Sequence, residues 1–179
     1  MKWTELEPKV VAIEGYLCEG QEQWLYESAA NLASKSRILE IGCYKGRSTS
    51  CLYGGAQESD SDLTSIDICA QHAEWTLASI NATFGTSVKF RQIVGSSVAE
   101  IPTLFMNGER FDLVFVDGHH LFPIVSCDIL NSFHIINPKG RIAVHDYTET
   151  WPEVMQSWNL LGPLFHSWSR CSTIVSGLK

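Results

Sequence analysis

Several features are missing from this sequence of 179 residues, and each absence excludes a class of protein. No apolar run follows the opening Met-Lys-Trp-Thr-Glu-Leu-Glu, so we expect neither a signal peptide nor a membrane-spanning segment. Lysine and arginine form no cluster along the sequence, and the net charge is −7. Nucleic acids and anionic membrane surfaces require basic patches that neutralise them, so neither is expected as a partner.

Paired cysteines are also missing. The six cysteines are scattered and include no C-x-x-C pair: Cys18, Cys43, Cys51, Cys69, Cys127 and Cys171. Several stand beside aliphatic residues, where a reduced cysteine packs as a small hydrophobe. This distribution favours a reduced, cytoplasmic protein over a disulfide-bonded secreted one.

The dinucleotide fingerprint G-x-G-x-x-G is absent, but a related glycine turn is present. In the run Arg37–Ser50, an apolar stretch ends at Gly42, and Gly46 precedes a helix expected to begin near Ser48. Glycines let a ligand approach the backbone closely, and free amides at a helix start attract polar or anionic groups. Tyr44 occupies the middle glycine position of the fingerprint and would crowd a pyrophosphate, which disfavours an NAD-dependent oxidoreductase.

An acidic residue follows this turn at an informative distance. The short apolar stretch Leu63–Asp67 ends in a carboxylate about twenty residues further on, the spacing at which an acid reaches ribose hydroxyls. Together, the glycine turn and Asp67 favour a ligand that contains adenosine.

The remaining sequence alternates between strand and helix patterns. Helices are expected at 21–34, 48–57, 71–84, 98–105, 123–136 and 151–161, and strands at 37–42, 63–67, 88–94, 111–116 and 141–144. Strands that are apolar on both faces and separated by helices predict an α/β fold, a Rossmann-like, mostly parallel sheet with helices on both faces.

We expect one domain with three parts. Residues 1–35 form an N-terminal helical segment, 36–147 the cofactor-binding core, and 148–179 a C-terminal helix and hairpin. The loose alternation after Gly162 predicts that hairpin, which would add an antiparallel terminal strand. Asn137–Gly140 is expected to be a turn, and Trp151 is expected in the core or at a partner interface.

Polar residues and glycines stand where the predicted strands end. They are Gly42, Asp67, Gly95, Asp117 and the pair His145-Asp146. Ligands of parallel α/β sheets gather at the carboxyl ends of the strands. The coincidence predicts a single site along this edge.

Two motifs in this arrangement resemble those of a known family. The first is L-E-I-G-x-Y-x-G-x-S-T at Leu39–Thr49; the second is Asp117-Gly-x-His120, with Asp128 further on and Pro-Lys-Gly before the last parallel strand. With them the chain resembles class I S-adenosylmethionine-dependent methyltransferases, in particular the catechol-type and the sugar or macrolide O-methyltransferases. The resemblance covers roughly Ser28 to Tyr147.

The resemblance implies a set of S-adenosylmethionine contacts. The methionine end would be lined by Glu40, Gly42, Tyr44 and Ser48, and the ribose would be held by Asp67. The adenine would pack on Ile68, with Gly95 and Ser96 at its edge. Asp117 is the remaining implied cofactor contact. The implied activity is methyl transfer to a hydroxyl of a small-molecule acceptor. The alternative is a non-catalytic adenosine-binding domain with a regulatory or scaffold role.

A divalent metal is also implied, with Asp117, His145 and Asp146 at the positions that hold it. Two carboxylates suit magnesium, and adding His145 shifts the preference toward manganese. His145 replaces the aspartate that is usual there, so it is either a ligand or a residue that hydrogen-bonds to the ligands. Asp117 could instead cap the helix that follows it.

The family's base is replaced by histidine. The catechol-type enzymes have a lysine where this chain has His120, and macrolide-type members have an acid where it has His119. Histidine titrates near neutral pH, so one of the two is expected to take the hydroxyl proton. The chain is close to the minimum length for the fold, which leaves room for a homo-oligomer whose partner subunit completes the pocket.

Overall fold

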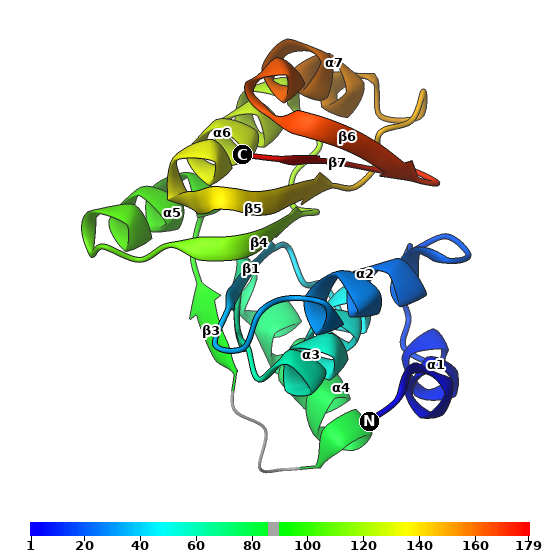
Figure 1. Ribbon diagram of the computed structural model, residues 1–179. Helices are drawn as coiled ribbons and strands as arrows, with labels where there is room; N and C mark the ends of the chain where they lie inside the picture. Colours follow the sequence, from blue (N-terminus) through cyan, green and yellow to red (C-terminus); the bar gives the residue numbers. More distant parts are fainter. Residues whose placement is uncertain (86–89) are drawn as a thin grey trace.

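The apolar runs pair into one sheet of seven strands in the computed structural model, which describes residues 1–85 and 90–179 (Figure 1). The strands are β1 (Arg37–Ile41), β2 (Asp62–Asp67), β3 (Arg91–Val94), β4 (Phe111–Val116), β5 (Ile136–Val144), β6 (His166–Cys171) and β7 (Ile174–Leu178). Their order is β3-β2-β1-β4-β5-β7-β6. The first five strands are parallel and β7 runs antiparallel to β5, which confirms the predicted fold class.

Helices cover both faces of this sheet. They are α1 (Trp3–Val11), α2 (Gln21–Ala30), α3 (Arg47–Ser59), α4 (Ala70–Phe84), α5 (Ser97–Met106), α6 (Phe122–Ile135) and α7 (Pro152–Leu161), followed by a short 3-10 turn at Gly162–Leu164. Figure 1 shows α5, α6 and α7 on one side of the sheet and α1 to α4 on the other. Among the described residues, no helix is both long and apolar enough to span a membrane.

The two faces bury alternate residues of each strand, because neighbours along a strand point in opposite directions. Ile38 of β1 and Leu113 of β4 pack with α1 to α4, whereas Leu39 and Val114 pack with α5 to α7. Strands with two buried faces therefore read as continuous apolar runs, which is why the sequence revealed them.

Two segments differ from the prediction. β5 begins at Ile136 and runs through the expected turn Asn137–Gly140, with a register shift opposite Phe111 and Leu113. Lys139 has φ +68° within this stretch, and the strand continues past it because Lys139 and Gly140 exchange backbone hydrogen bonds with Lys179 at the end of the chain. α1, which the sequence left unassigned, is a helix whose apolar side is buried. Of the strand expected at 88–94, the part at 88–89 lies outside the described residues.

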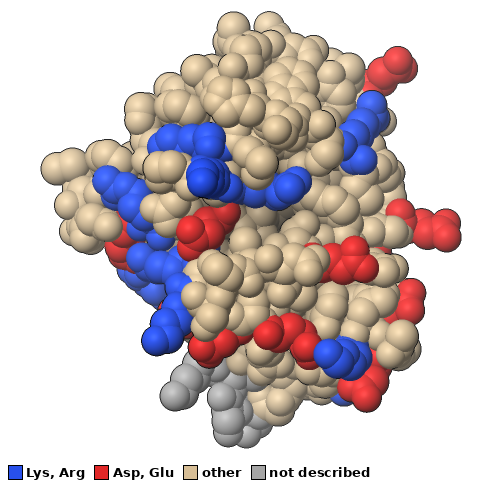
Figure 2. Space-filling view, in the orientation of Figure 1, with Lys and Arg blue, Asp and Glu red and all other residues tan. Residues whose placement is uncertain are grey.

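Basic side chains gather in space although they are scattered along the sequence. Arg37 and Arg91 begin β1 and β3 and share the carboxylate of Glu109, and Arg110 immediately precedes β4. Figure 2 shows most of the blue surface on the left of the view, where the strands begin. Basic residues that form no cluster along the sequence thus lie close together in the folded chain, whose net charge is −7.

All six cysteines are free. Cys51 is buried in an apolar cluster, as expected for a reduced cysteine that packs as a small hydrophobe. Cys43 is also buried, but its Sγ contacts the polar groups of Asp67 and Gln92.

Helices α2 and α3 approach each other closely at Gly55. A Cβ atom added there would lie 2.2 Å from the carbonyl oxygen of Tyr26 and 2.8 Å from the Cβ of Ala29. Both distances are shorter than van der Waals contact, so only glycine fits between the two backbones. The contact fixes α3, and with it the turn at its start, against α2.

We expect Gly55→Ala to destabilise the protein by about 1–3 kcal/mol, because the added methyl group forces α2 and α3 apart. In an uncrowded helix the same change would stabilise by up to about 1 kcal/mol, so the sign of the effect is diagnostic. Urea denaturation measures it, with Gln57→Ala, at an exposed position of the same helix, as the control. A Gly55→Ala variant as stable as the native protein would contradict the close approach.

Candidate active site

The turn between β1 and α3 lies against the end of β4. Gly42 has φ +85°, and a Cβ atom there would lie 2.3 Å from the backbone oxygen of Asp117. Backbone hydrogen bonds join the same segments, since the Asp117 amide donates to Ile41 O at 2.8 Å. Glycine is required at this position both by its conformation and by the neighbouring chain.

Asp67, at the end of β2, holds this turn. Its Oδ2 accepts hydrogen bonds from the amides of Cys43 at 2.9 Å and Tyr44 at 3.3 Å, and its Oδ1 accepts one from Cys69 at 2.8 Å. The two features that sequence reasoning linked by spacing are therefore in direct contact.

His72 belongs to the same group, although sequence reasoning missed it. Its Nδ1 lies 3.1 Å from Asp67 Oδ1, and its ring contacts Tyr44 edge-on. The signal in the sequence was a histidine in the first turn of the helix that follows the strand ending in Asp67. A helix start near a strand end brings such a side chain back to the sheet edge.

A cavity of about 740 Å³ lies at this edge of the sheet. Most of the predicted site residues line it: Gly42, Tyr44, Ser48, Asp67, Ile68, Gly95, Ser96, Asp117, His119, His120 and Asp146. Ile68 is 75% exposed, so an apolar side chain is presented at the cavity rim and not buried in the core. Glu40 and His145, also predicted, are not among the lining residues.

The segment between α1 and α2 covers one side of the cavity. Glu14 accepts a hydrogen bond from Tyr44 Oη at 2.7 Å and pairs with Lys45. Tyr16 stacks on Tyr44 with ring centroids 5.8 Å apart, and Leu17 also lines the cavity. Sequence reasoning left this segment unassigned because its contacts with the cavity residues are long-range.

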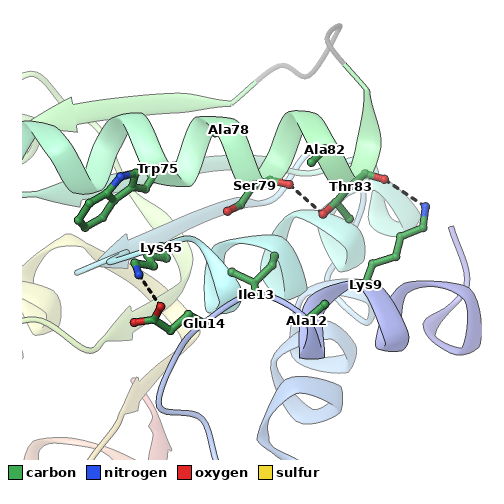
Figure 3. A pocket seen from close by; sticks show the side chains of 10 residues that line it. All are labelled: Lys9, Ala12, Ile13, Glu14, Lys45, Trp75, Ala78, Ser79, Ala82 and Thr83. Atoms are coloured by element: carbon green, nitrogen blue, oxygen red, sulfur yellow. Dashed lines mark hydrogen bonds and ion pairs between the residues drawn. The ribbon is translucent and has the colours of Figure 1, made fainter.

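A second hollow shares two of these residues. It has a volume of about 610 Å³ and lies between α1 and α4, lined partly by alanines. Figure 3 shows the pair of Lys45 and Glu14 at one end and, at the other, Lys9 donating to the Thr83 carbonyl. No predicted site residue lines this hollow.

Glu40 lies behind the cavity, in a shell of hydroxyl groups. Ser48 Oγ and Thr49 Oγ1 donate to its carboxylate at 2.7 and 2.6 Å, and Ser65 Oγ donates at 2.9 Å. Complete burial raises its pKa to about 7, although the three hydrogen bonds act in the opposite direction. Glu40 thus orients Ser48, which does line the cavity.

The ends of β4 and β5 bring two carboxylates together around a buried histidine. His145 Nδ1 lies 3.1 Å from Asp117 Oδ1 and 3.1 Å from Asp146 Oδ2, and neither contact has hydrogen-bond geometry. Burial would lower the pKa of His145, but the two carboxylates outweigh it and raise the pKa to about 10. The contacts are therefore those of an ion pair between imidazolium and carboxylates.

Asp117, His120 and Asp146 each offer a ligand atom, and these atoms lie within 4.8 Å of one another. Two carboxylate oxygens and one imidazole nitrogen fit a divalent ion such as Mg²⁺ or Mn²⁺. The structure adds His120, which was not among the predicted ligands, to the two acids at the cavity. The predicted His145 also lies 3.1 Å from each acid, and its Nε2 lies 3.0 Å from Gln21 Oε1.

The two adjacent loop histidines have different environments. His120 Nε2 lies 2.7 Å from Asp146 Oδ2, whereas His119 Nδ1 accepts a hydrogen bond from the Leu121 amide at 3.0 Å. Burial would raise the pKa of Asp146, but its contacts with His120 and His145 lower it well below its usual range.

Trp151 stands at the cavity and not in the core. Its ring stacks on His120 with centroids 4.1 Å apart and an interplanar angle of 14°. It immediately precedes Pro152, the first residue of α7, so the chain turns there at the edge of the sheet. The expectation of a core position was wrong, because helical spacing could not show where this helix begins. The alternative, a partner interface, stays a prediction.

Solved methyltransferase structures share this fold. The O-methyltransferase from Bacillus cereus, in complex with SAH, superposes with a TM-score of 0.74 at 15% identity, over 100% of this chain and 92% of that one. The O-methyltransferase TomG from Streptomyces achromogenes, involved in tomaymycin synthesis and solved with SAM, gives 0.72 at 19%, over 100% and 91%. The SAH-bound methyltransferase from Podospora anserina gives 0.75 at 16%, over 98% and 86%. The fold is that of the class I methyltransferases.

Sequence comparison identifies the family. The family described as "methyltransferase domain" matches residues 39–147, which is more than half of the chain. The chain belongs to this methyltransferase family. No curated protein matches its sequence significantly.

The buried carboxyl of Glu40 predicts a pH dependence of stability. Its pKa is about 7 in the folded state and near 4.5 when exposed, so its stabilising contribution is complete below pH 4.5 and is lost as the pH rises to 7. Glu40→Gln, which does not ionise, should therefore gain up to roughly 3 kcal/mol relative to the native protein between pH 4.5 and 8.

Urea denaturation of both proteins at pH 5 and pH 8 measures this difference. The buried carboxyl of Asp128, whose pKa burial raises to about 6, is present in both proteins and cancels. A stability difference that does not change with pH would show that Glu40 is not protonated in the folded protein near pH 6.

Proposed function

We propose that the protein transfers the methyl group of S-adenosylmethionine to a hydroxyl of a small molecule, assisted by a divalent metal. The observation that carries this proposal is that one cavity holds both the Gly42 turn with Asp67 and the group of Asp117, His120 and Asp146. In this proposal the two groups serve as the cofactor end and the acceptor end of that cavity. Methyl transfer requires mainly that two reactants be held in line.

The residues present fit the cofactor. Gly42 lines the cavity at the turn, and Asp67, which also lines it, has the carboxylate that ribose hydroxyls require. Ile68 presents an exposed apolar side chain on which an adenine ring would pack, and Gly95 and Ser96 would border the edge of that ring. S-adenosylmethionine, when bound, supplies an electrophilic methyl group. The solved neighbours that contain SAM or SAH support this choice.

The acceptor end has the groups needed to hold and deprotonate a hydroxyl. Asp117, His120 and Asp146 would hold the divalent ion, which lowers the pKa of a hydroxyl bound to it. Without an ion, Asp146 orients His120 by accepting the Nε2 hydrogen, which leaves Nδ1 as a base. His119 is less suited, since its Nδ1 already accepts the Leu121 amide hydrogen.

We expect Asp67→Ala to weaken S-adenosylmethionine binding about tenfold or more, because a charged acceptor for the ribose hydroxyls is lost. Isothermal titration calorimetry measures the affinity. Asp62→Ala, at the exposed opposite end of the same strand, is the matched control and should bind normally. Unchanged affinity in Asp67→Ala would exclude the ribose role.

Turnover tests the reaction itself. The protein is incubated with S-adenosylmethionine carrying a labelled methyl group, Mg²⁺ or Mn²⁺, and a panel of aromatic diols and sugars. Labelled ether product is expected, and Asp117→Asn should abolish the metal-dependent part of it because one carboxylate ligand is lost. Glu149→Gln, at an exposed position in the segment between β5 and α7, is the control and should remain active.

Two other outcomes would contradict parts of the proposed function. Full activity in excess chelator would remove the metal and leave His120 as the base. Tight cofactor binding without methylation of any acceptor would favour the non-catalytic adenosine-binding domain.

A further inference from the structure

Gln21, the first residue of α2, is completely buried and contacts His145, the histidine between Asp117 and Asp146. It lies outside residues 39–147, which match the family. A buried primary amide is costly unless its polar atoms find partners. The next residue, Glu22, is also buried and pairs with Arg47, which lines the cavity. The start of α2 therefore contacts Arg47 through Glu22 and His145 through Gln21.

The contacts of Gln21 fix which way its amide points. Oε1 accepts a hydrogen bond from the Cys18 amide at 2.7 Å, and Nε2 donates to the Cys171 carbonyl at 3.4 Å and to Thr173 Oγ1 at 2.8 Å. A backbone N–H only donates and a carbonyl only accepts, so a flipped amide would lose both bonds.

This orientation determines the orientation of His145. Its Nε2 lies 3.0 Å from Gln21 Oε1, which can only accept, so the hydrogen must be on Nε2. The opposite edge of the ring, Nδ1, is then directed at Asp117 and Asp146, 3.1 Å from each. Thr173 Oγ1, at 3.5 Å from Nε2, is the weaker second contact.

We propose that Gln21 is a positioning residue of this site: it holds the His145 ring by Nε2–H, and through that ring it holds the carboxylates of Asp117 and Asp146. The contacts join three parts of the chain, namely α2, β5 and the hairpin of β6 and β7. What the carboxylates do rests on the proposed function, whereas the arrangement of Gln21 and His145 does not.

Nuclear magnetic resonance of the imidazole groups in the full-length protein tests the arrangement. In Gln21→Leu the His145 Nε2–H signal should shift and exchange with solvent about tenfold faster, since its main acceptor is lost. Gln21→Glu keeps an acceptor oxygen at the same place and should retain the native signal. Gln23→Leu, on the exposed side of the same helix, is the matched control, and His145→Asn assigns the signal.

Retention of the native Nε2–H signal in a folded Gln21→Leu protein would overturn the proposal. If Gln21→Leu does not fold, Gln21→Met, unbranched and of similar length, is measured in its place. Circular dichroism and thermal unfolding of each variant separate a local loss of this bond from a general loss of structure.

Mn²⁺ alone serves as the probe for the carboxylates. Gln21→Leu should bind it about tenfold more weakly than the native protein, as is usual when a residue that supports the ligands is removed, and Gln21→Glu should recover the affinity. Equal affinity in Gln21→Leu would show that the carboxylates do not depend on Gln21. If the native protein binds no Mn²⁺, the metal part of the proposed function fails, and the His145 signal alone decides the role of Gln21.

Discussion

The close approach of β1 and β4 is the constraint on which the site depends. At Gly42 the backbone of one strand end touches the backbone of the other, with no space for a side chain between them. This contact places the turn at Gly42 beside Asp117, and the parallel neighbours β2 and β5 then bring Asp67 and Asp146 to the same edge. Parallel strands end on one side of a sheet, so residues far apart in the sequence share one cavity.

Buried ionisable groups around the cavity are held by specific partners and not by solvent. Glu40 is surrounded by three hydroxyls and has a raised pKa, whereas His145 lies between two carboxylates and has a raised pKa for the opposite reason. Burial disfavours the charge of Glu40, while the neighbouring acids favour the charge of His145. Neither Glu40 nor His145 lines the cavity, but each fixes side chains that do.

The fold and the turn at Gly42 with Asp67 were predictable because they depend on local signals. Apolar runs, glycines and strand-ending acids occur in order along the chain, and both residues follow directly from them. The surroundings of His120 and His145 were less predictable. Trp151 stacks on His120, and Gln21 contacts His145, across separations of 31 and 124 residues that no local pattern encodes.

The sequence by itself therefore determined the order of strands and helices along the chain, the edge of the sheet where the candidate site lies, and which residue types stand there. Only the tertiary structure decided that His120 joins the two carboxylates at the cavity. It also placed His145 against the same carboxylates, and Gln21 at the start of α2 against His145. The physical reason is that periodicity and spacing follow from the backbone, whereas the direction of a buried side chain follows from hydrogen bonds with partners elsewhere in the chain.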